Sequence, residues 1–529
     1  MNTIKHLSII LITVLLCLTA QAQLKTNKAT VKWGPEIDAS KRSSLSDIVA
    51  VDDEFYYALR WEKTDLNIEK YNFKCEQIVS RELNIEAGNS KLREYQGIRD
   101  FGLEPMHLFS SFYNKKDEKN YLFKQTLNRK TLAPNDDAEM IAEMDLSESK
   151  GKRFSDFSIL TADDSSHVMV YFNKPEQKEG FQKLEMQVYT NTMKMLWKRD
   201  VELPYEDELF DVTQRRIDHN GNVYILGKLY KDKVKSRVKG APNYTWRLIC
   251  FDESGEKFNQ EIKMDEYFMP DITFRIAKNN DVICVGFYST QGKSDIDGVF
   301  YLNIDPITNQ VKKSSLKEFE LDFVMETLTD KQSKKMAKRV DKGADTQLMS
   351  YDLDRLILRE DGSATIIGEQ YVFRVTTRTV SNPNGGMSTT TTYHYHYNNI
   401  LVININSSGE ISWATQIPKR QHSTNDGGYY SSYASAIVGD QIYFVFNDNV
   451  ENLFIKEGQK IKNYTFGKKS MVILVHLDEN GEWTKEGLFS KLEADVITIP
   501  KVCEQIKADE MVIFGKWKKD QKFATVKFK

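Results

Sequence analysis

Five consecutive residues alternate between tyrosine and histidine: Tyr393, His394, Tyr395, His396 and Tyr397. Successive side chains of a β-strand point to opposite faces, so a strand here would place the three tyrosines on one face and the two histidines on the other. Tyrosine rings offer apolar surfaces with a hydroxyl group, and such residues dominate the energetics of binding surfaces. The run therefore predicts a surface that binds a sugar or a peptide.

The same run has two other interpretations. Tyr429 and Tyr430 follow a pair of glycines in a neighbouring segment, and the tyrosines of the run could pack on that segment instead of on a ligand. The histidines could begin a metal site, but two imidazoles do not make a site and His422 is only a candidate third ligand. We predict that Tyr429 and Tyr430 belong to the ligand-binding surface, with no metal and no other cofactor.

The sequence contains none of the common catalytic motifs that we considered. The histidines do not occur as His-Glu-x-x-His, and there is no Gly-x-Ser-x-Gly or glycine-rich phosphate loop. Acidic pairs such as Asp163 and Asp164 fall in short turns, where neighbouring carboxylates do not converge on a glycosidic bond. Enzymatic activity is therefore uncertain and binding is favoured. The alternative is a hydrolase or lyase that acts on polysaccharide with histidines and carboxylates.

Composition excludes some partners. The chain has 529 residues with 73 Lys and Arg against 76 Asp and Glu, a formal net charge of -3. Such a balance lacks the basic field typical of nucleic-acid binding, so no nucleic-acid partner is expected. The four cysteines beyond residue 22 are Cys75, Cys250, Cys284 and Cys503; they have no metal or redox spacing, so we expect free thiols.

The first 22 residues have the pattern of a secretory signal peptide. Lys5 and His6 precede an apolar run over residues 7–18, and Ala20 and Ala22 supply the small residues of a cleavage site. The run is too short to span a bilayer, and no later stretch is long and apolar enough to do so. We expect a secreted or periplasmic protein without a transmembrane segment.

A strand, a tight turn and a second strand recur along the rest of the chain. Eight such hairpins have turns near positions 52, 104, 163, 220, 280, 361, 439 and 508. Their spacing suits one four-stranded sheet each, which predicts an all-β, eight-bladed β-propeller as a single domain over residues 23–529. The second hairpin is the weakest, so seven blades are the alternative. Residues 29–37 resemble a fourth strand with nothing before it, and residues 522–528 a third strand with nothing after it. Their pairing would close the ring.

Five long segments are expected on one face of this ring, at about residues 230–245, 319–350, 375–397, 418–432 and 447–469. Loops on a rigid scaffold commonly carry binding residues. Residues 371–380 and 387–397 both alternate like strands, so they should form a long hairpin arm. We predict that a monomer binds a protein or glycan ligand of the cell envelope at this face.

The segments 369–371, 393–399, 417–421 and 446–449 contain Glu-Gln-Tyr, Tyr-His-Tyr-His-Tyr-Asn-Asn, Ile-Pro-Lys-Arg-Gln and Phe-Asn-Asp-Asn. In these motifs the chain resembles a group of uncharacterised secreted β-propeller proteins of Bacteroidota. The resemblance covers about a fifth of the chain. It implies an extracytoplasmic location and a propeller fold, and it carries over no functional residues.

Overall fold

The structure is a computed structural model that describes most of the chain from residue 23 onward. The described residues are 23–83, 85–87, 91–92, 94–102, 105–135, 137–147, 156–174, 180–233, 243–264, 267–290, 296–308, 310–320, 323–324, 334, 338, 351–381, 387–456 and 459–529. The predicted signal peptide, the centre of the 230–245 segment and most of the 319–350 segment lie outside these residues.

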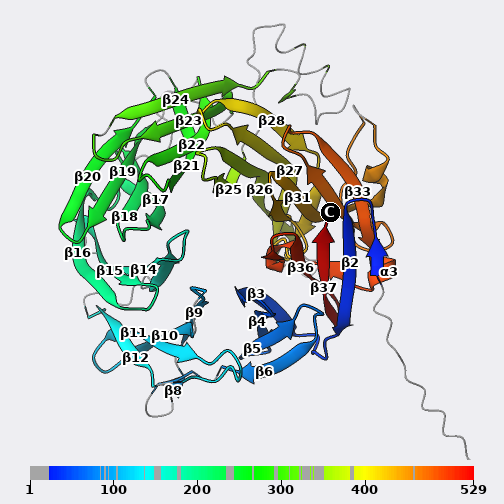
Figure 1. The fold of residues 1–529 in the computed structure, drawn as a ribbon, viewed down its shortest axis with the longest axis horizontal. Coiled ribbons are helices and arrows are strands. Elements are labelled where there is room, and N and C mark those ends of the chain that lie inside the picture. The colour runs from blue at the N-terminus through cyan, green and yellow to red at the C-terminus, as the bar shows by residue number, and fades with distance from the viewer. Residues whose placement is uncertain are drawn as a thin grey trace, which may run out of the picture.

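Eight sheets of four or more strands are arranged in a ring, which we number as blades 1 to 8 in chain order (Figure 1). The first strand of each blade lies nearest the centre. These first strands are β3 (Ser43–Val51), β9 (Glu94–Arg99), β13 (Ser158–Thr161), β17 (Phe210–Ile217), β21 (Phe268–Ile276), β25 (Asp352–Leu358), β30 (Ala434–Val438) and β35 (Glu504–Lys507).

The second strands are β4 (Phe55–Glu62), β10 (Met106–Asn114), β14 (His167–Asn173), β18 (Val223–Tyr230), β22 (Val282–Ser289), β26 (Ala364–Ser381), β31 (Gln441–Asn449) and β36 (Glu510–Trp517). The third strands are β5 (Asp65–Asn72), β11 (Lys119–Leu127), β15 (Phe181–Thr190), β19 (Tyr244–Asp252), β23 (Gly298–Ile304), β27 (Met387–Ile405), β32 (Ser470–Leu477) and β37 (Asp520–Phe528). The fourth strands are β6 (Gln77–Glu82), β12 (Glu139–Asp145), β16 (Met195–Glu206), β20 (Gly255–Ile262), β24 (Val311–Glu318), β28 (Ile411–Ile417), β33 (Trp483–Ser490) and β2 (Ala29–Glu36).

Short elements join these blades. They are β1 (Gln23–Lys25), β7 (Glu86–Ala87), β8 (Lys91–Leu92), β29 (Gln421–Thr424), β34 (Ile497–Thr498), η1 (Val450–Leu453), α3 (Lys491–Ala494) and η2 (Pro500–Val502). In the part of the chain described here, no helix is long and apolar enough to cross a membrane. The described cysteines are free thiols, as expected.

The core consists of eight clusters of buried apolar side chains, and each cluster joins two neighbouring blades. Strand position explains the burial: all eight residues of β22 are buried, whereas the outer strand β24 is mostly exposed. Side chains on both faces of the second and third strands bury apolar surface against adjacent blades, which is the main stabilising contribution. Since one of these clusters joins blade 8 to blade 1, the ring is continuous.

The two ends of the described chain close the ring, as predicted. Strand β2 pairs antiparallel with β37, from Ala29 opposite Phe528 to Glu36 opposite Lys522. Blade 2 also has four strands, so the eight-bladed prediction is confirmed and seven blades are excluded. Strand β1 was not predicted; it pairs with β2 and covers the outer edge of blade 8.

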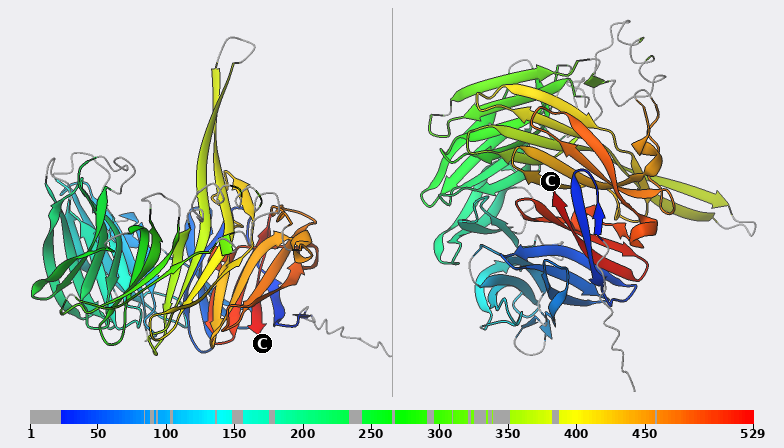
Figure 2. Two further views of the ribbon diagram at one scale, coloured as in Figure 1. Left: turned by 90° about the horizontal axis from the view of Figure 1, so that it is seen from above. Right: turned by 45° about the vertical axis from the view of Figure 1, so that its right-hand side comes forward.

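The links between second and third strands and those between blades lie on one face, which we call the insertion face. The predicted arm is confirmed there. The segment at 375–397 is a continuation of β26 and β27 that projects far beyond the other blades (Figure 2). Residues 418–432 contain β29, and 447–469 contain η1. The opposite face holds the tight turns between first and second strands and is called the short-turn face.

Candidate functional site

The arm is a two-stranded ribbon that blade 6 supports from below. We define it as β26 from Tyr371 to Ser381 with β27 from Met387 to Tyr397, which pair without interruption. Strand β25 stops pairing with β26 at Glu369, immediately before a register shift. From that point outward the β26 edge of the arm has no partner strand among the described residues, whereas residues 394–397 of β27 pair with β29.

Residues opposite each other in an antiparallel pair lie on the same face, so the pairing register defines two faces of the arm. The aromatic face consists of Tyr371, Phe373 and Val375 opposite Tyr397, Tyr395 and Tyr393. The rings form a continuous row. Their centroids are 4.8 Å apart for Tyr371 and Tyr397, 5.3 Å for Phe373 and Tyr395, and 6.2 Å for Phe373 and Tyr393. The predicted alternation of the tyrosines and histidines is therefore correct.

Exposure changes along the aromatic face. Phe373 is 47% exposed and Tyr393 44%, whereas Tyr397 is 9% exposed. The outer rings face solvent while the innermost ring is part of the packed body. An exposed row of large apolar rings is typical of an interaction surface, because monomeric proteins rarely leave such a row uncovered.

Tyr397 packs against neighbouring residues of the protein, which was the alternative to ligand contact. Its ring lies against Gly428, where an added Cβ would come within 2.4 Å of the ring. Lys501 donates a hydrogen bond of 2.8 Å to the Tyr397 hydroxyl and lies 4.6 Å from the centre of its ring. Tyr429 and Tyr430 are half-buried at the edge of the cluster between blades 8 and 1. Contact of these two residues with a ligand stays a prediction.

The basic face consists of Arg374, Arg378, His394 and His396, together with His422 from β29. The His396 and His422 rings stack with centroids 4.3 Å apart, and Nδ1 of His394 lies 3.1 Å from Nε2 of His422. Burial first, and then the charges of neighbouring histidines and arginines, lower the pKa of His396 and of His422.

These histidines do not have the geometry of a metal site. Their ring planes lie within about 11° of one another, as in a stack, so their nitrogen lone pairs do not converge on one point. Among the residues that the structure describes, no three His, Cys, Asp or Glu side chains are arranged to hold a metal ion. Thr376 and His422 are the hydrogen-bond partners of His394 within the described residues, and the carboxylate of Asp426 is the opposing charge near His422.

A buried polar network fixes the base of the arm. The fully buried ammonium of Lys419 forms an ion pair with Glu369 and donates to Gln421 at 3.1 Å. Glu369 also accepts a hydrogen bond of 2.7 Å from Ser432. Burial lowers the pKa of Lys419, and Glu369 opposes that effect. Because a buried charge is costly without a partner, these contacts hold β29 and the following loop against the arm.

One edge of the arm carries unpaired backbone groups. On the β27 side, Asn425 forms hydrogen bonds with both backbone groups of Tyr393. The Asn425 side chain accepts from the Tyr393 N–H at 2.9 Å, and the Asn425 N–H donates to the Tyr393 carbonyl at 3.0 Å. The N–H and C=O groups of Tyr393 therefore point away from β26. Because Val375 lies opposite Tyr393 in the pair, its N–H and C=O groups must point away from β27. By the same alternation, Phe373 and Thr377 present their N–H and C=O groups to the outer edge. No described strand pairs with that edge.

A second feature lies at the centre of the ring, and the sequence analysis missed it. In five of the eight first strands an acid lies nearer the insertion face and a base lies nearer the short-turn face. The pairs are Glu94 and Arg99 in β9, Asp211 and Arg216 in β17, Asp271 and Arg275 in β21, Asp352 and Arg355 in β25, and Glu504 and Lys507 in β35. This order of charges, repeated in five first strands, is the signal that could have predicted a polarised axis.

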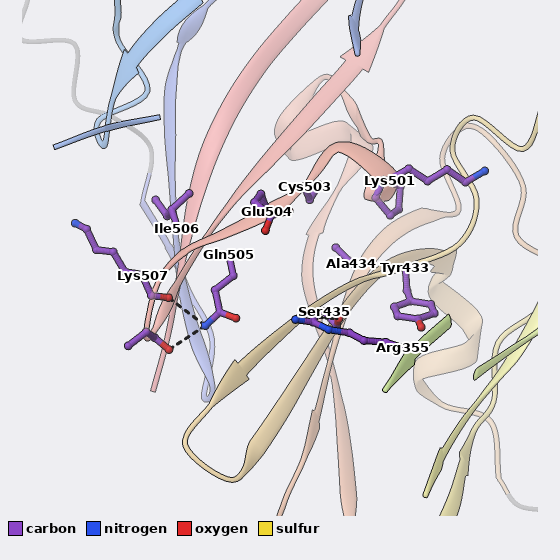
Figure 3. Close-up of a pocket in the computed structure, with 12 residues that line it drawn as sticks. Arg355, Tyr433, Ala434, Ser435, Lys501, Cys503, Glu504, Gln505, Ile506 and Lys507 are labelled. Atoms are coloured by element: carbon purple, nitrogen blue, oxygen red, sulfur yellow. Dashed lines mark hydrogen bonds between the residues drawn. The ribbon is translucent and has the colours of Figure 1, made fainter. Parts of the chain in front are cut away.

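Two cavities open on these inner strands. One, of about 550 Å³, lies between the first strands of blades 6, 7 and 8, with Arg355 and Ser435 on one side and Glu504 and Gln505 on the other (Figure 3). Arg355 donates to the Ser435 hydroxyl at 3.3 Å. Burial raises the pKa of Glu504, and the charge of Arg355 opposes this. The other cavity, of about 860 Å³, lies at the short-turn ends of blades 3 to 6 and shares Arg355.

No family model and no curated protein matches this chain. Among solved structures, prolyl oligopeptidase B from Galerina marginata aligns at 10% identity and a TM-score of 0.37, covering 92% of this chain and 56% of that one. The WD40 domain of SCAP from fission yeast aligns at 8% identity and a TM-score of 0.37, covering 94% and 98%. An uncharacterised protein of Listeria monocytogenes aligns at 9% identity and a TM-score of 0.35, covering 81% and 94%.

The chain thus corresponds to about half the length of the prolyl oligopeptidase structures that it matches. Likeness at these identities and TM-scores supports no inference about activity, substrates or partners.

Proposed function

We propose that this protein is an interaction module that binds an extended segment of a partner protein by adding it as a strand to the free edge of β26. The observation that carries the proposal is the unpaired edge at Phe373, Val375 and Thr377, beside an exposed aromatic row. Binding by strand addition takes its affinity from main-chain hydrogen bonds and its specificity from alternate side chains.

The two faces of the arm specify the partner's chemistry. On the aromatic face, Phe373 and Tyr393 are positioned to pack against apolar side chains of the added strand. On the basic face, Arg374 and Arg378 follow the same edge, and residues 371–397 contain no Asp or Glu. A partner segment that alternates apolar and acidic residues would match both faces.

A protein partner is favoured over a glycan for a specific reason. A glycan can stack on Tyr393 and Phe373, but it has no regular backbone that could satisfy successive N–H and C=O groups of a strand edge. We also propose that the protein acts outside the cytoplasm. This location is supported by the signal-peptide pattern of residues 1–22.

Proline at Thr377 gives a direct test. Proline lacks the N–H that an added strand requires, whereas Thr377 does not use that N–H to pair with β27, so the arm itself should survive. A displayed library of acidic and apolar peptides is selected on the wild-type protein. The enriched peptides should lose binding to Thr377→Pro and keep it with Thr377→Ala, the matched control that retains the N–H.

Contrary results are equally clear. Peptides that bind Thr377→Pro as well as wild type would contradict strand addition, provided that the variant keeps the wild-type melting temperature. A glycan array run in parallel addresses the other class. Glycans that bind wild type and Thr377→Pro equally, without any selected peptide, would replace the protein partner by a sugar.

A further inference from the structure

The cavity of about 860 Å³ at the short-turn face, which we call the arginine cavity, is lined by the ends of inner strands β17, β21 and β25 and by the turns that follow them. Its basic residues include Arg216, Arg275 and Arg359. A cavity of this volume is large enough for a small organic molecule. It lies on the face opposite the arm.

The carboxylates that line the arginine cavity already have ion-pair or hydrogen-bond partners within the protein. Asp163 forms an ion pair with Arg275, Asp281 with Lys312 at 2.6 Å, and Glu360 with Lys278. Asp218 accepts hydrogen bonds from the backbone and side chain of Asn222 at 2.8 Å each. These carboxylates hold the turns of the short-turn face or pair with other cations.

Arg216 differs from every cation just named. Within the described residues its guanidinium has no hydrogen bond and no ion pair, and its Nε is buried without a partner. It packs over the Phe274 ring, with Cζ 5.5 Å from the ring centre. Burial, and then the neighbouring charge of Arg275, lower the pKa of Arg216 to about 10, and the more weakly acting charge of Asp163, which is itself paired with Arg275, opposes this. An unpaired guanidinium beside a second one is an arrangement that a bound anion stabilises.

We propose that the arginine cavity is a second binding site, in which Arg216 binds the carboxylate or phosphate group of a small organic anion. The planar guanidinium suits either oxyanion, because it donates two parallel hydrogen bonds. The occupied carboxylates around it provide acceptors for hydroxyl groups on the rest of the ligand. They also oppose ligands with several acidic groups, which favours a molecule with a single carboxylate or a single phosphate group.

Three sugars that share the glucose scaffold can show whether the site binds a carboxylate or a phosphate. Glucose, glucuronate and glucose 6-phosphate differ in having no anion, a carboxylate or a phosphate. Calorimetry at constant ionic strength should show binding of at least one of the two acids and none of glucose. Which acid binds identifies the oxyanion that Arg216 prefers. Absence of binding by both acids to the wild-type protein at millimolar concentration would overturn the proposal.

Two neighbouring arginines provide the variant and its control. Arg216→Gln should weaken binding of the acid at least tenfold, because it removes the unpaired charge. Arg215→Gln is the matched control: Arg215 is adjacent in β17 but lies over the Tyr171 ring on the other side, and it does not line the cavity. Equal affinities for wild type and Arg216→Gln, or equal losses in both variants, would overturn the assignment.

The unliganded proteins give a second readout that does not depend on the choice of ligand. If Arg216 is an uncompensated charge, Arg216→Gln in a buffer without oxyanions should melt at or above the wild-type temperature. Wild type alone should then gain melting temperature when inorganic phosphate is added. A large loss of stability in the unliganded variant would instead identify Arg216 as a structural residue and overturn its role as a vacant anion site.

Discussion

Arg60 of blade 1 donates a hydrogen bond of 2.6 Å to the side chain of Gln521 in blade 8, joining residues that are 461 positions apart in the chain. The same guanidinium forms an ion pair of 2.9 Å with Glu69, and both side chains of that pair are almost fully buried. Tyr71 donates a further hydrogen bond of 2.8 Å to Glu69. The seam that closes the ring therefore contains a charged network inside an apolar interface.

Removing one charge of this network should be costly. Arg60→Met leaves the Glu69 carboxylate buried without its cation, and we expect a loss of about 3–5 kcal/mol in the free energy of unfolding. The double variant Arg60→Met with Glu69→Met should be less destabilised than the sum of the single changes. Urea unfolding measures both. The exposed pair of Lys278 and Glu360 is the control, since Lys278→Met should cost under about 1 kcal/mol.

Closure of the ring by β2 depends on Trp33. Its ring packs edge-on against Phe489 of blade 7 at 4.9 Å, and it is 6% exposed. Trp33→Ala should lower the free energy of unfolding by about 3–5 kcal/mol, because it leaves a cavity between blades 7 and 8. Trp61 is 37% exposed, so Trp61→Ala should stay within about 1 kcal/mol of wild type. Equal stabilities of the two variants would contradict closure by β2.

The stacked histidines should make the arm sensitive to acid. His396 and His422 have lowered pKa values in the folded protein, so the unfolded chain binds protons more readily. Their contribution to stability is therefore present above pH 6.5 and is lost as the pH falls through the lowered values. Protonation would place new charges beside Arg374 and Arg420, with Asp426 the opposing charge near His422.

His422→Phe keeps a stacking ring without a titrating group, so its melting temperature should fall less than that of wild type between pH 7.5 and 5. His219→Gln, at the distant short-turn face, should retain the wild-type dependence. Parallel pH curves for wild type and His422→Phe would show that the histidine stack does not respond to protonation.

Tyr393 and Tyr397 should separate binding from packing. Tyr397 is buried against Gly428 and bonded to Lys501, so Tyr397→Ala should cost about 2–5 kcal/mol of unfolding free energy. Tyr393 is exposed, so Tyr393→Ala should leave the melting temperature nearly unchanged and weaken binding of the selected peptides. A large drop in melting temperature with Tyr393→Ala, with peptide binding retained, would assign both rings to packing.

Much of this architecture is already present in local sequence. The turn near position 220 has Asp218, whose carboxylate accepts from the backbone N–H groups of Asn220 and Asn222, and Gly221 with a φ of +78°. Such turns depend on residues a few positions apart, so all eight inner hairpins could be predicted. The alternation of tyrosine and histidine likewise determined the two faces of the arm, because the period of a strand is a local property.

Tertiary structure alone decided which neighbours these residues meet. His422 stacks on His396 because β29 folds back onto β27, and Lys501 reaches Tyr397 from 104 positions away. Arg216 and Arg275 both end inner strands, yet only Arg275 finds a carboxylate, supplied by Asp163 of blade 3. The period of a strand determines the direction of a side chain but contains no information about the segment that packs against it. Ring geometry therefore determined which charges are paired and which remain available to a ligand.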